Sequence, residues 1–455
     1  MNLRPWLLFL VPGAGCLPSP PALPAQTSTG SASTDTSASP ATDDATTEPS
    51  DSGPGSTATE GTGDATSTGS TGADSTDEGS STGEPQDFCG LPRAEFVFDP
   101  PDVFTVGGAP AVLATGSFVG NDDDPDIAVA NDDNEPRIDI LRGQGILSGF
   151  QIADPITSID GASSVAIGEI NGSPPSELAV LGQQQWQIYG PDPESMNSVM
   201  QLSGGVIMGA SGQSILLADI LGDSNDELVL AAGFNGVTGT VDVIEDPIVS
   251  VNGLAQLIDA GRNAQIMTTG DFNGDTQLDL ALPRTDPAAG IAGPDFVDIV
   301  FNESTPGSPA FSTATVESTG DPWGVASADL DGDGVDDLVL GHTGVGSVPL
   351  QLFFGDGDGG FSDPISLPYT STQTVVRAAD LDCDGDIDIV AGANGDVVVW
   401  RANGPGNFDS SDFEVFVAGT GLISDIAIAD MDLSNRLDIV VALRDAGEVA
   451  YLEAN

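Results

Sequence analysis

The stretch DLDGDGVDDLVLG (residues 329–341) places five carboxylates in its first nine residues and then turns apolar. Like charges at this density repel one another unless water or a cation lies among them. If Asp329 is position 1, Asp331, Asp333 and Asp337 stand at positions 3, 5 and 9, and a backbone carbonyl falls near position 7. Gly334 permits a sharp turn with positive φ. This oxygen-only spacing predicts a Ca²⁺ site, and the alternative for a single copy is a solvated acidic turn.

Three further copies of this loop follow the pattern closely. DFNGDTQLDLAL and DLDCDGDIDIVAG fill every liganding position, and DMDLSNRLDIVVAL lacks only the carboxylate at position 5, where Ser434 stands. Repetition at a fixed period argues for a structural unit rather than chance. The calcium ligands that we predict in these copies are Asp271, Asn273, Asp275 and Asp279; Asp380, Asp382, Asp384 and Asp388; and Asp430, Asp432 and Asp438.

Three earlier copies depart from the pattern. EINGSPPSELAVLG begins with Glu169, DILGDSNDELVLAAG has Leu221 at position 3, and SFVGNDDDPDIAVAN begins with Ser117 and has one extra residue before Asp126. We predict no calcium ligands in these three. The seven copies begin near residues 117, 169, 219, 271, 329, 380 and 430, with a period of 50 to 58 residues.

Each loop is flanked by strand-like sequence. An acid, an aliphatic residue, any residue and a second aliphatic residue follow every loop, and a Gly or Ala precedes it. A β-rich run on either side of a Gly/Asp turn predicts a hairpin, and the small residue suits an innermost strand crowded around an axis. A third strand such as DVVVW and a fourth such as FEVFVA come later in each period. Four short strands per unit, repeated seven times, predict an all-β fold, a seven-bladed β-propeller.

The loops with their following strands resemble the FG-GAP and VCBS repeats of the integrin α-chain head and of many bacterial surface proteins. The resemblance covers about residues 94–455, and its most specific part is the three complete loops. It implies a seven-bladed propeller with calcium bound between the first and second strands of some blades. No partner domain of the integrin type is recognisable, so the resemblance does not extend to integrin-like signalling.

The two ends of the repeat region predict how the ring closes. The last copy ends with AGEVAYLEAN, which supplies a third strand but no fourth. The segment AEFVFDPPDVFTVG (residues 94–107) has strand composition and no loop of its own. We therefore expect this segment to complete blade seven, which would leave no open seam.

The N-terminus has the features of a lipoprotein signal. Residues 1–15 contain one Arg and a short apolar run that is too short to span a bilayer, and Ala14-Gly15-Cys16 resembles the bacterial lipobox. We predict signal cleavage before Cys16, lipidation of Cys16, and anchoring at the outer membrane on the cell surface. The alternative is ordinary cleavage near Ala25 and secretion. Residues 16–88, rich in Ser, Thr, Gly and acids, predict a disordered linker before a propeller at residues 89–455.

Composition limits the partners of the chain. Ten Arg, no Lys and seventy acids give a net charge of −60, which disfavours nucleic acid and anionic membrane surfaces. We expect a monomer that meets the membrane only through its lipid anchor and that binds an extracellular protein or glycan. The chain has three cysteines, and Cys89 and Cys383 are candidates for a disulfide; the alternative is two unpaired thiols.

Catalytic side chains are scarce in this chain. It has one His and three Tyr, although carboxylate pairs alone can hydrolyse glycosides. We place His342 in a hairpin turn after the second strand of blade five. Trp323, Arg262 and Arg377 lie near the entries of the first strands, where packing or local ion pairs are the expected roles. The predicted function is a non-enzymatic calcium-binding propeller for adhesion or ligand binding; the alternative is a secreted polysaccharide lyase or hydrolase.

Overall fold

The structure is a computed structural model, and it describes the chain from Phe96 to Asn455 with internal gaps. The predicted signal peptide (1–15) and linker (16–88), together with Cys16 and Cys89, lie outside the described residues. None of the described residues forms a helix with the length and hydropathy needed to span a bilayer. The gaps are residues 121–123, 132–136, 145–148, 158, 160, 196, 208–210, 235–237, 249–255, 259–265, 285–294, 306–307, 319–320, 344–349 and 368–374.

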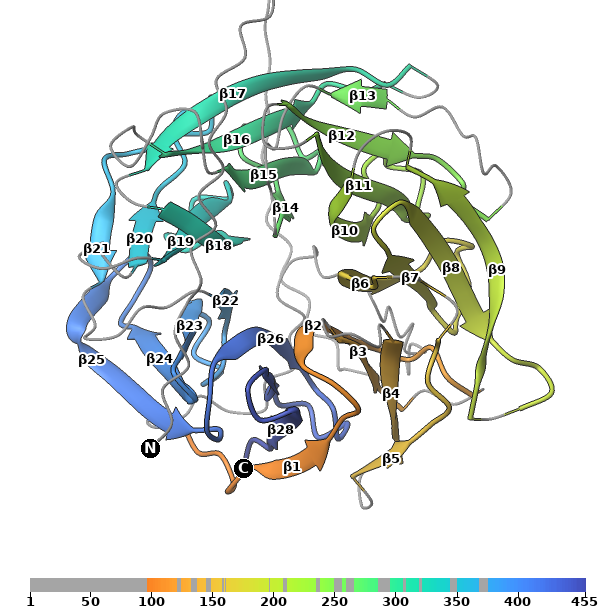
Figure 1. Ribbon diagram of the computed structural model, residues 1–455. Coiled ribbons are helices and arrows are strands. Elements are labelled where there is room, and N and C mark those ends of the chain that lie inside the picture. The colour runs from red at the N-terminus through yellow and green to blue at the C-terminus, as the bar shows by residue number, and fades with distance from the viewer. Residues whose placement is uncertain are drawn as a thin grey trace, which may run out of the picture. The chain divides into compact units, whose positions relative to one another are not determined.

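Seven four-stranded antiparallel sheets stand around one axis (Figure 1). The innermost strands are β2 (Pro110–Gly116), β6 (Ser164–Gly168), β10 (Ser211–Ala218), β14 (Thr268–Gly270), β18 (Asp321–Ala328), β22 (Val375–Ala379) and β26 (Ile423–Ala429). The second strands are β3 (Asp126–Asn131), β7 (Glu177–Leu181), β11 (Glu227–Phe234), β15 (Asp279–Arg284), β19 (Asp337–Thr343), β23 (Asp388–Ala393) and β27 (Asp438–Leu443). The prediction of a seven-bladed propeller is confirmed.

The outer half of each blade is built from two further strands. The third strands are β4 (Arg137–Gly143), β8 (Gln185–Pro191), β12 (Thr238–Ile244), β16 (Asp295–Asn302), β20 (Leu350–Phe353), β24 (Asp396–Ala402) and β28 (Glu448–Leu452). The outermost strands are β5 (Phe150–Ile152), β9 (Val199–Val206), β13 (Gln256–Ile258), β17 (Phe311–Ser318), β21 (Ile365–Leu367), β25 (Phe408–Val417) and β1 (Asp102–Thr105).

The second strand is the hydrophobic centre of each blade. In β3, β7, β23 and β27 every residue is buried, because the neighbouring blades cover both faces of the sheet. Such strands are continuous apolar runs without polar alternation, which is why each loop is followed by aliphatic residues. The core is divided into clusters that lie between neighbouring blades, as where Val390 of β23 packs in one cluster with Ile426 and Ile439 of blade seven.

The ring closes through the N-terminal strand, as predicted. β1 pairs antiparallel with β28, and Asp102 lies opposite Tyr451. Upstream of β1, Phe98 forms an isolated bridge with Ala454. Blade seven thus takes one strand from the start of the propeller and three from its end, so the closing sheet pins both ends of the domain (Figure 1).

The small residue before each loop makes room for the next blade. A Cβ on Gly168 would lie 2.3 Å from Oδ2 of Asp226, and one on Gly270 would lie 2.7 Å from Oδ2 of Asp336. Both aspartates stand at position 8 of the following loop. The same carboxylates accept hydrogen bonds from the position-1 N–H of the preceding blade, at 2.7 Å for Glu169 and 2.8 Å for Asp271. These neighbouring loops are therefore joined by a partly buried hydrogen bond.

Candidate metal centres

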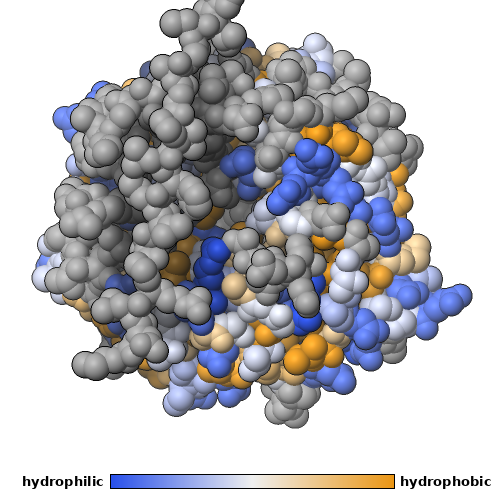
Figure 2. All heavy atoms as spheres, in the orientation of Figure 1, coloured by the Kyte–Doolittle hydropathy of each residue, from blue (hydrophilic) through white to orange (hydrophobic). Residues whose placement is uncertain are grey.

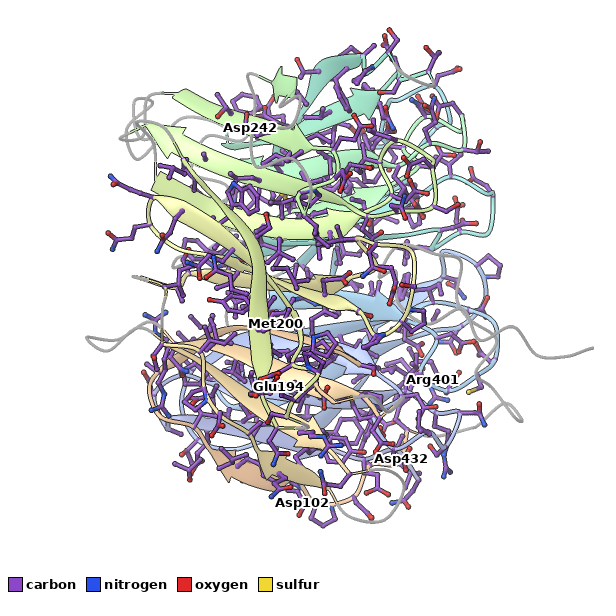
Figure 3. All side chains as sticks on the ribbon, turned by 90° about the vertical axis from the view of Figure 1, so that its right-hand side faces the viewer. Asp102, Glu194, Met200, Asp242, Arg401 and Asp432 are labelled. Atoms are coloured by element: carbon purple, nitrogen blue, oxygen red, sulfur yellow. The ribbon has the colours of Figure 1, made fainter. Side chains whose placement is uncertain are left out.

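The seven acidic loops join the first strand of each blade to the second, as the repeat pattern predicted. Figure 3 shows that labelled residues associated with two of these loops, Arg401 and Asp432, lie toward the same side of the propeller. The acid-rich loops therefore lie at one end of the blades. The space-filling view in Figure 2, in the orientation of Figure 1, shows hydrophilic and hydrophobic residues interspersed among the described residues.

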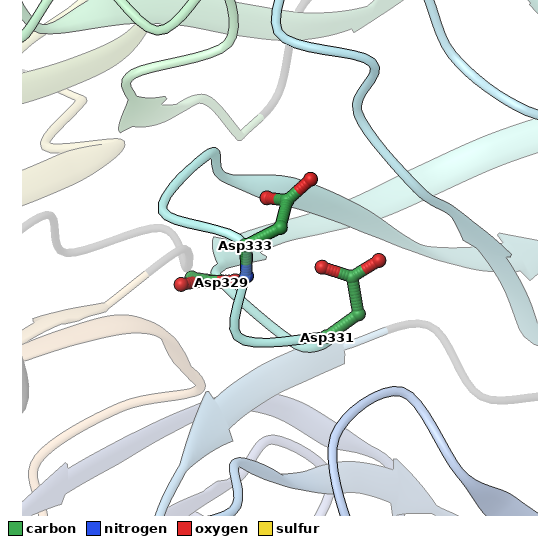
Figure 4. Close-up of side chains that lie close together, drawn as sticks. All are labelled: Asp329, Asp331 and Asp333. Carbon is green, nitrogen blue, oxygen red and sulfur yellow. Dashed lines mark hydrogen bonds between the residues drawn. The ribbon is translucent and has the colours of Figure 1, made fainter.

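The position-1 aspartate holds the loop backbone. In five loops its two oxygens accept hydrogen bonds of 2.7 to 3.2 Å from N–H groups at positions 4 to 6. Asp329, for example, accepts from Gly332, Asp333 and Gly334 (Figure 4). Several converging N–H groups stabilise a carboxylate in the way that a helix N-terminus does. These hydrogen bonds tie position 1 to the backbone of the turn.

The last acid of each loop, which we call the closing carboxylate, is buried in all seven copies with at most 2% of its surface exposed. It accepts a hydrogen bond of 2.8 to 3.1 Å from an N–H near the start of the loop. In five blades its other oxygen accepts one of 2.7 to 2.9 Å from an N–H at the end of the third strand or within two residues of it. The closing carboxylates are Asp126, Glu177, Glu227, Asp279, Asp337, Asp388 and Asp438.

Burial makes the closing carboxylates costly to ionise. It raises the pKa of Asp337 to about 7 and that of Asp388 to about 8, although backbone hydrogen bonds to Leu330, Gly355 and Ala402 act in the opposite direction. Desolvation disfavours the charged form, and neighbouring acids of the same loop add to the effect. A bound divalent cation would favour the charged form, so each loop holds a carboxylate whose ionisation a metal would assist.

Three loops bring acidic oxygens together. One group contains Asp329, Asp331 and Asp333, and in each group the ligand oxygens lie within 4.8 Å of one another (Figure 4). The other two groups are Asp380, Asp382 and Asp388, and Asp430, Asp432 and Asp438. These clusters fall in three of the four loops for which we predicted calcium ligands. The assignment of ligands stays a prediction, because exposed acids also gather without a metal.

Some predicted ligands lie outside these clusters. Asp337 and Asp384 are not members, although their loops form clusters. In the loop at Asp271, no three described acids approach within the same limit. There Asn273 accepts a hydrogen bond from the N–H of Asp275 at 2.9 Å, so position 3 contributes to the turn.

Two position-3 carboxylates have oxygens with unmet hydrogen-bonding capacity. Oδ1 of Asp331 and Oδ1 of Asp382 are buried and have no hydrogen-bond partner among the described residues. Asp382 is only 1% exposed, and its Oδ2 lies 3.0 Å from NH1 of Arg401. A buried acceptor without a partner is costly, so these two atoms are the best evidence that the loops can take a cation.

Two loops of the incomplete set, those of blades two and three, lack a cluster of acids, although Oε2 of Glu169 in blade two is also buried without a hydrogen-bond partner among the described residues. In blade two, Asn171 donates to Glu177, Ser173 donates to Asn171, and Ser176 donates to Glu169 at 2.7 Å. In blade three, position 3 is Leu221, which offers no side-chain oxygen. Among the described residues of these loops, no three acids gather as they do in blades five to seven.

The structure corrects the predicted location of His342 and shows the surroundings of two other residues that the sequence singled out. His342 does not lie in a hairpin turn: it is a fully buried residue of β19, and its Nε2 lies 3.1 Å from Oγ of Ser318. The strand continues beyond the apolar run to Thr343, because His342 and Thr343 pair with Pro322 and Asp321 of β18. Arg377 pairs with the buried Asp425. Trp323 is 40% exposed on β18, and Arg262 lies outside the described residues.

Cys383 occupies position 4 of the blade-six loop, where five other copies have glycine and blade seven has Leu433. Its φ of 67° lies in the left-handed region, and its sulfur is disulfide-bonded. A disulfide at Cys383 agrees with the predicted pairing, whose other member, Cys89, lies outside the described residues. Sequence reasoning missed Arg401, because nothing in the repeat pattern connects the third strand to the loop.

Comparisons with known proteins agree with this fold. Residues 380–441 match the model of the FG-GAP-like repeat. No curated protein sequence matches the chain. The crystal structure of BBS1N in complex with ARL6DN, soaked with mercury, is similar with a TM-score of 0.52 and 11% identity over 79% of this chain and 97% of that one. A lead-soaked crystal of the same complex gives 0.52 and 12% over the same shares.

A further similar structure is that of the Dos1 propeller, with a TM-score of 0.47 and 12% identity over 78% of this chain and 95% of that one. Identities this low concern the fold alone. The chain is a seven-bladed β-propeller, and its residues 380–441 match the FG-GAP-like repeat.

Proposed function

We propose that this propeller is a calcium-stabilised binding scaffold that is displayed on the bacterial cell surface by a lipid at Cys16. The observation that supports calcium best is the pair of buried, unpartnered oxygens, Oδ1 of Asp331 and Oδ1 of Asp382, each within a cluster of three acids. Calcium prefers such hard oxygen ligands and tolerates the flexible geometry of a short loop.

The ligands would be the predicted side chains of blades four to seven. Asp329, Asp331 and Asp333 already lie together, whereas Asp337 would join them through lone pairs that its two backbone hydrogen bonds leave free. A Ca²⁺ ion would offset the mutual repulsion of these acids. It would thereby tighten the end of each blade without altering the strands.

The side chains that could act in catalysis are engaged in structural contacts, which favours a binding role. The single histidine is buried in a strand, and Arg377 and Arg401 are engaged in ion pairs with buried aspartates. Six of the closing carboxylates have raised pKa values because they are buried, and these carboxylates hold backbone N–H groups inside the blades. We therefore propose an extracellular protein or glycan as the partner of a monomeric, non-enzymatic scaffold.

Thermal unfolding of the full chain tests the calcium proposal. We expect the melting temperature to rise with Ca²⁺, to rise much less with Mg²⁺, and to fall with chelator, because binding to the folded state alone stabilises it. Asp333→Ala should reduce the calcium response. Asp223→Ala is the matched control: both aspartates stand at position 5 and accept the N–H of position 7, but Asp223 belongs to no acid cluster. A melting temperature that ignores calcium would refute the proposal.

Metabolic labelling tests the anchor. A palmitate analogue should label the wild-type chain in a bacterial host but not Cys16→Ser, because only the thiol can carry the lipid. Equal labelling of the two chains would contradict the lipoprotein assignment while leaving the calcium proposal intact.

A further inference from the structure

The third strand of each blade ends beside the acidic loop. In five blades a backbone N–H near the end of the third strand donates to the second oxygen of the closing carboxylate. The residue of interest is the one that comes directly before this donor in the sequence. We call this residue the flanking position. It is Arg142, Phe301, Phe354, Arg401 and Glu453 in blades one, four, five, six and seven.

The flanking residue of blade six is a fixed cation. NH1 of Arg401 lies 3.0 Å from Oδ2 of Asp382, and NH2 lies 3.6 Å from Oε1 of Glu414. Its guanidinium also lies over the ring of Phe96, 4.3 Å from the centroid. The side chain of Arg401 is only 14% exposed, so contacts on several sides hold its charge in place.

This fixed cation contacts a cluster acid directly. Oδ2 of Asp382 pairs with Arg401, while Oδ1 is buried and has no hydrogen-bond partner among the described residues. Oδ1 is therefore the oxygen that remains for a metal in the cluster with Asp380 and Asp388. A Ca²⁺ ion bound there would stand one carboxylate away from a permanent positive charge.

The other loops differ at the flanking position. In blade five the ring of Phe354 approaches Gly406, and a Cβ on Gly406 would lie 2.9 Å from Cβ of Asp331. This flanking side chain therefore also reaches toward position 3, but it is uncharged. In blade seven the flanking residue is Glu453, whose pKa is raised by partial burial and then by the charge of Asp432. The charge of Arg436 in the same loop acts on the pKa of Glu453 in the opposite direction, and its Nε donates to Ser434 at 3.4 Å.

We propose that the flanking position sets the calcium affinity of each loop through its charge. Arg401 lowers the calcium affinity of the otherwise complete loop of blade six, whereas the uncharged Phe354 leaves the calcium affinity of the blade-five loop unchanged. In blade seven, Glu453 supplies part of the negative charge that is missing at Ser434. This inference rests on the proposed calcium role and adds a residue set that the repeat motif does not contain. The blade-five loop should therefore fill first.

Calorimetric calcium titration of the full chain tests the inference. Arg401→Gln should tighten one site by roughly tenfold, because a unit charge so close to a divalent ion acts at short range. Arg401→Lys keeps the charge and should stay near the wild-type affinity. Arg142→Gln is the matched control, since it removes the same charge at the same position beside a loop without a predicted site. Glu453→Gln should weaken one site, whereas Glu448→Gln at the other end of β28 should not.

A double-mutant cycle assigns the effect to blade six. In an Asp380→Asn background, which removes a member of the cluster, Arg401→Gln should no longer change calcium binding. Equal changes from Arg401→Gln and Arg142→Gln, or weaker binding by Arg401→Gln, would overturn the inference while calcium binding by the wild type stands. Absence of calcium binding by the wild type would instead overturn the proposed function and the inference together.

Discussion

The loops of blades three and five have similar backbone hydrogen bonds but differ at position 3, where only one of them has an acid. In both, the position-1 aspartate caps the loop backbone and the closing carboxylate is buried against an N–H near the loop start. Position 3 is Leu221 in blade three and Asp331 in blade five. Only the blade-five loop gathers three acids and leaves a buried oxygen without a partner.

This comparison separates two roles for the acids of these two loops. In both, the acids at positions 1 and 9 accept backbone N–H groups and attach the turn to the blade. The acid at position 3 is present only in the loop that gathers a cluster. Of the positions at which the two loops differ, position 3 is therefore the one that decides whether a third acid joins the cluster.

The largest effect is expected from removing a closing carboxylate. Asp337→Ala should lower the free energy of unfolding in chelator by about 2–5 kcal/mol, because the backbone N–H groups of Leu330 and Gly355 lose their acceptor in a buried environment. Glu227→Ala in blade three should also destabilise, since Leu221 loses its acceptor. Urea unfolding in chelator measures both. If the free energy of unfolding falls by less than about 0.5 kcal/mol, these acids do not stabilise the loops.

An intermediate effect is expected from exchanging the residue at position 3. Leu221→Asp should destabilise the chain in chelator and create a calcium response, because it places a further acid among those of blade three. Asp331→Leu should do the reverse in blade five. Each site gained or lost should change the calcium-dependent stability by about 2.7 kcal/mol at a hundred times its dissociation constant. If both variants keep the wild-type calcium response, position 3 does not distinguish the loops.

The smallest effect is expected from pH in the absence of calcium. The pKa of Asp337 is raised to about 7 and that of Glu227 to about 8, whereas in the unfolded chain they lie near 3.8 and 4.5. The folded state therefore binds protons more tightly, and this stabilisation is complete below about pH 4 and is lost as the pH rises through 7 to 8. Melting curves in chelator should show a higher melting temperature at pH 5.5 than at pH 8.

Calcium should reverse this pH trend only where a site exists. Protons and Ca²⁺ compete for the same carboxylates, so the calcium-induced rise in melting temperature should be larger at pH 8 than at pH 5.5. Asp331→Leu should diminish that difference. The same gain at both pH values would indicate that the ion does not bind through these acids.

The repeat pattern determined the fold of this protein, because each copy specifies its own hairpin. The acid-rich loop, the small residue before it and the aliphatic residues after it recur seven times, and such local signals fix strand order within a blade. The unmatched strand at residues 94–107 determined how the ring closes. His342 was misplaced because its partner Ser318 belongs to β17 of the neighbouring blade four, a contact that local sequence does not show.

The candidate site could be predicted only in part from the sequence. Spacing alone identified the acids at positions 1, 3, 5 and 9, since these lie within nine residues of one another. It could not distinguish the acids that hold backbone N–H groups from those that remain unpartnered, because the N–H groups of Gly355 and Ala402 come from the third strand. Nor could it find Arg401 beside Asp382, a contact between residues 19 positions apart that exists only when the blade is folded. Local composition determined the loops, and the tertiary structure decided the charge around each one.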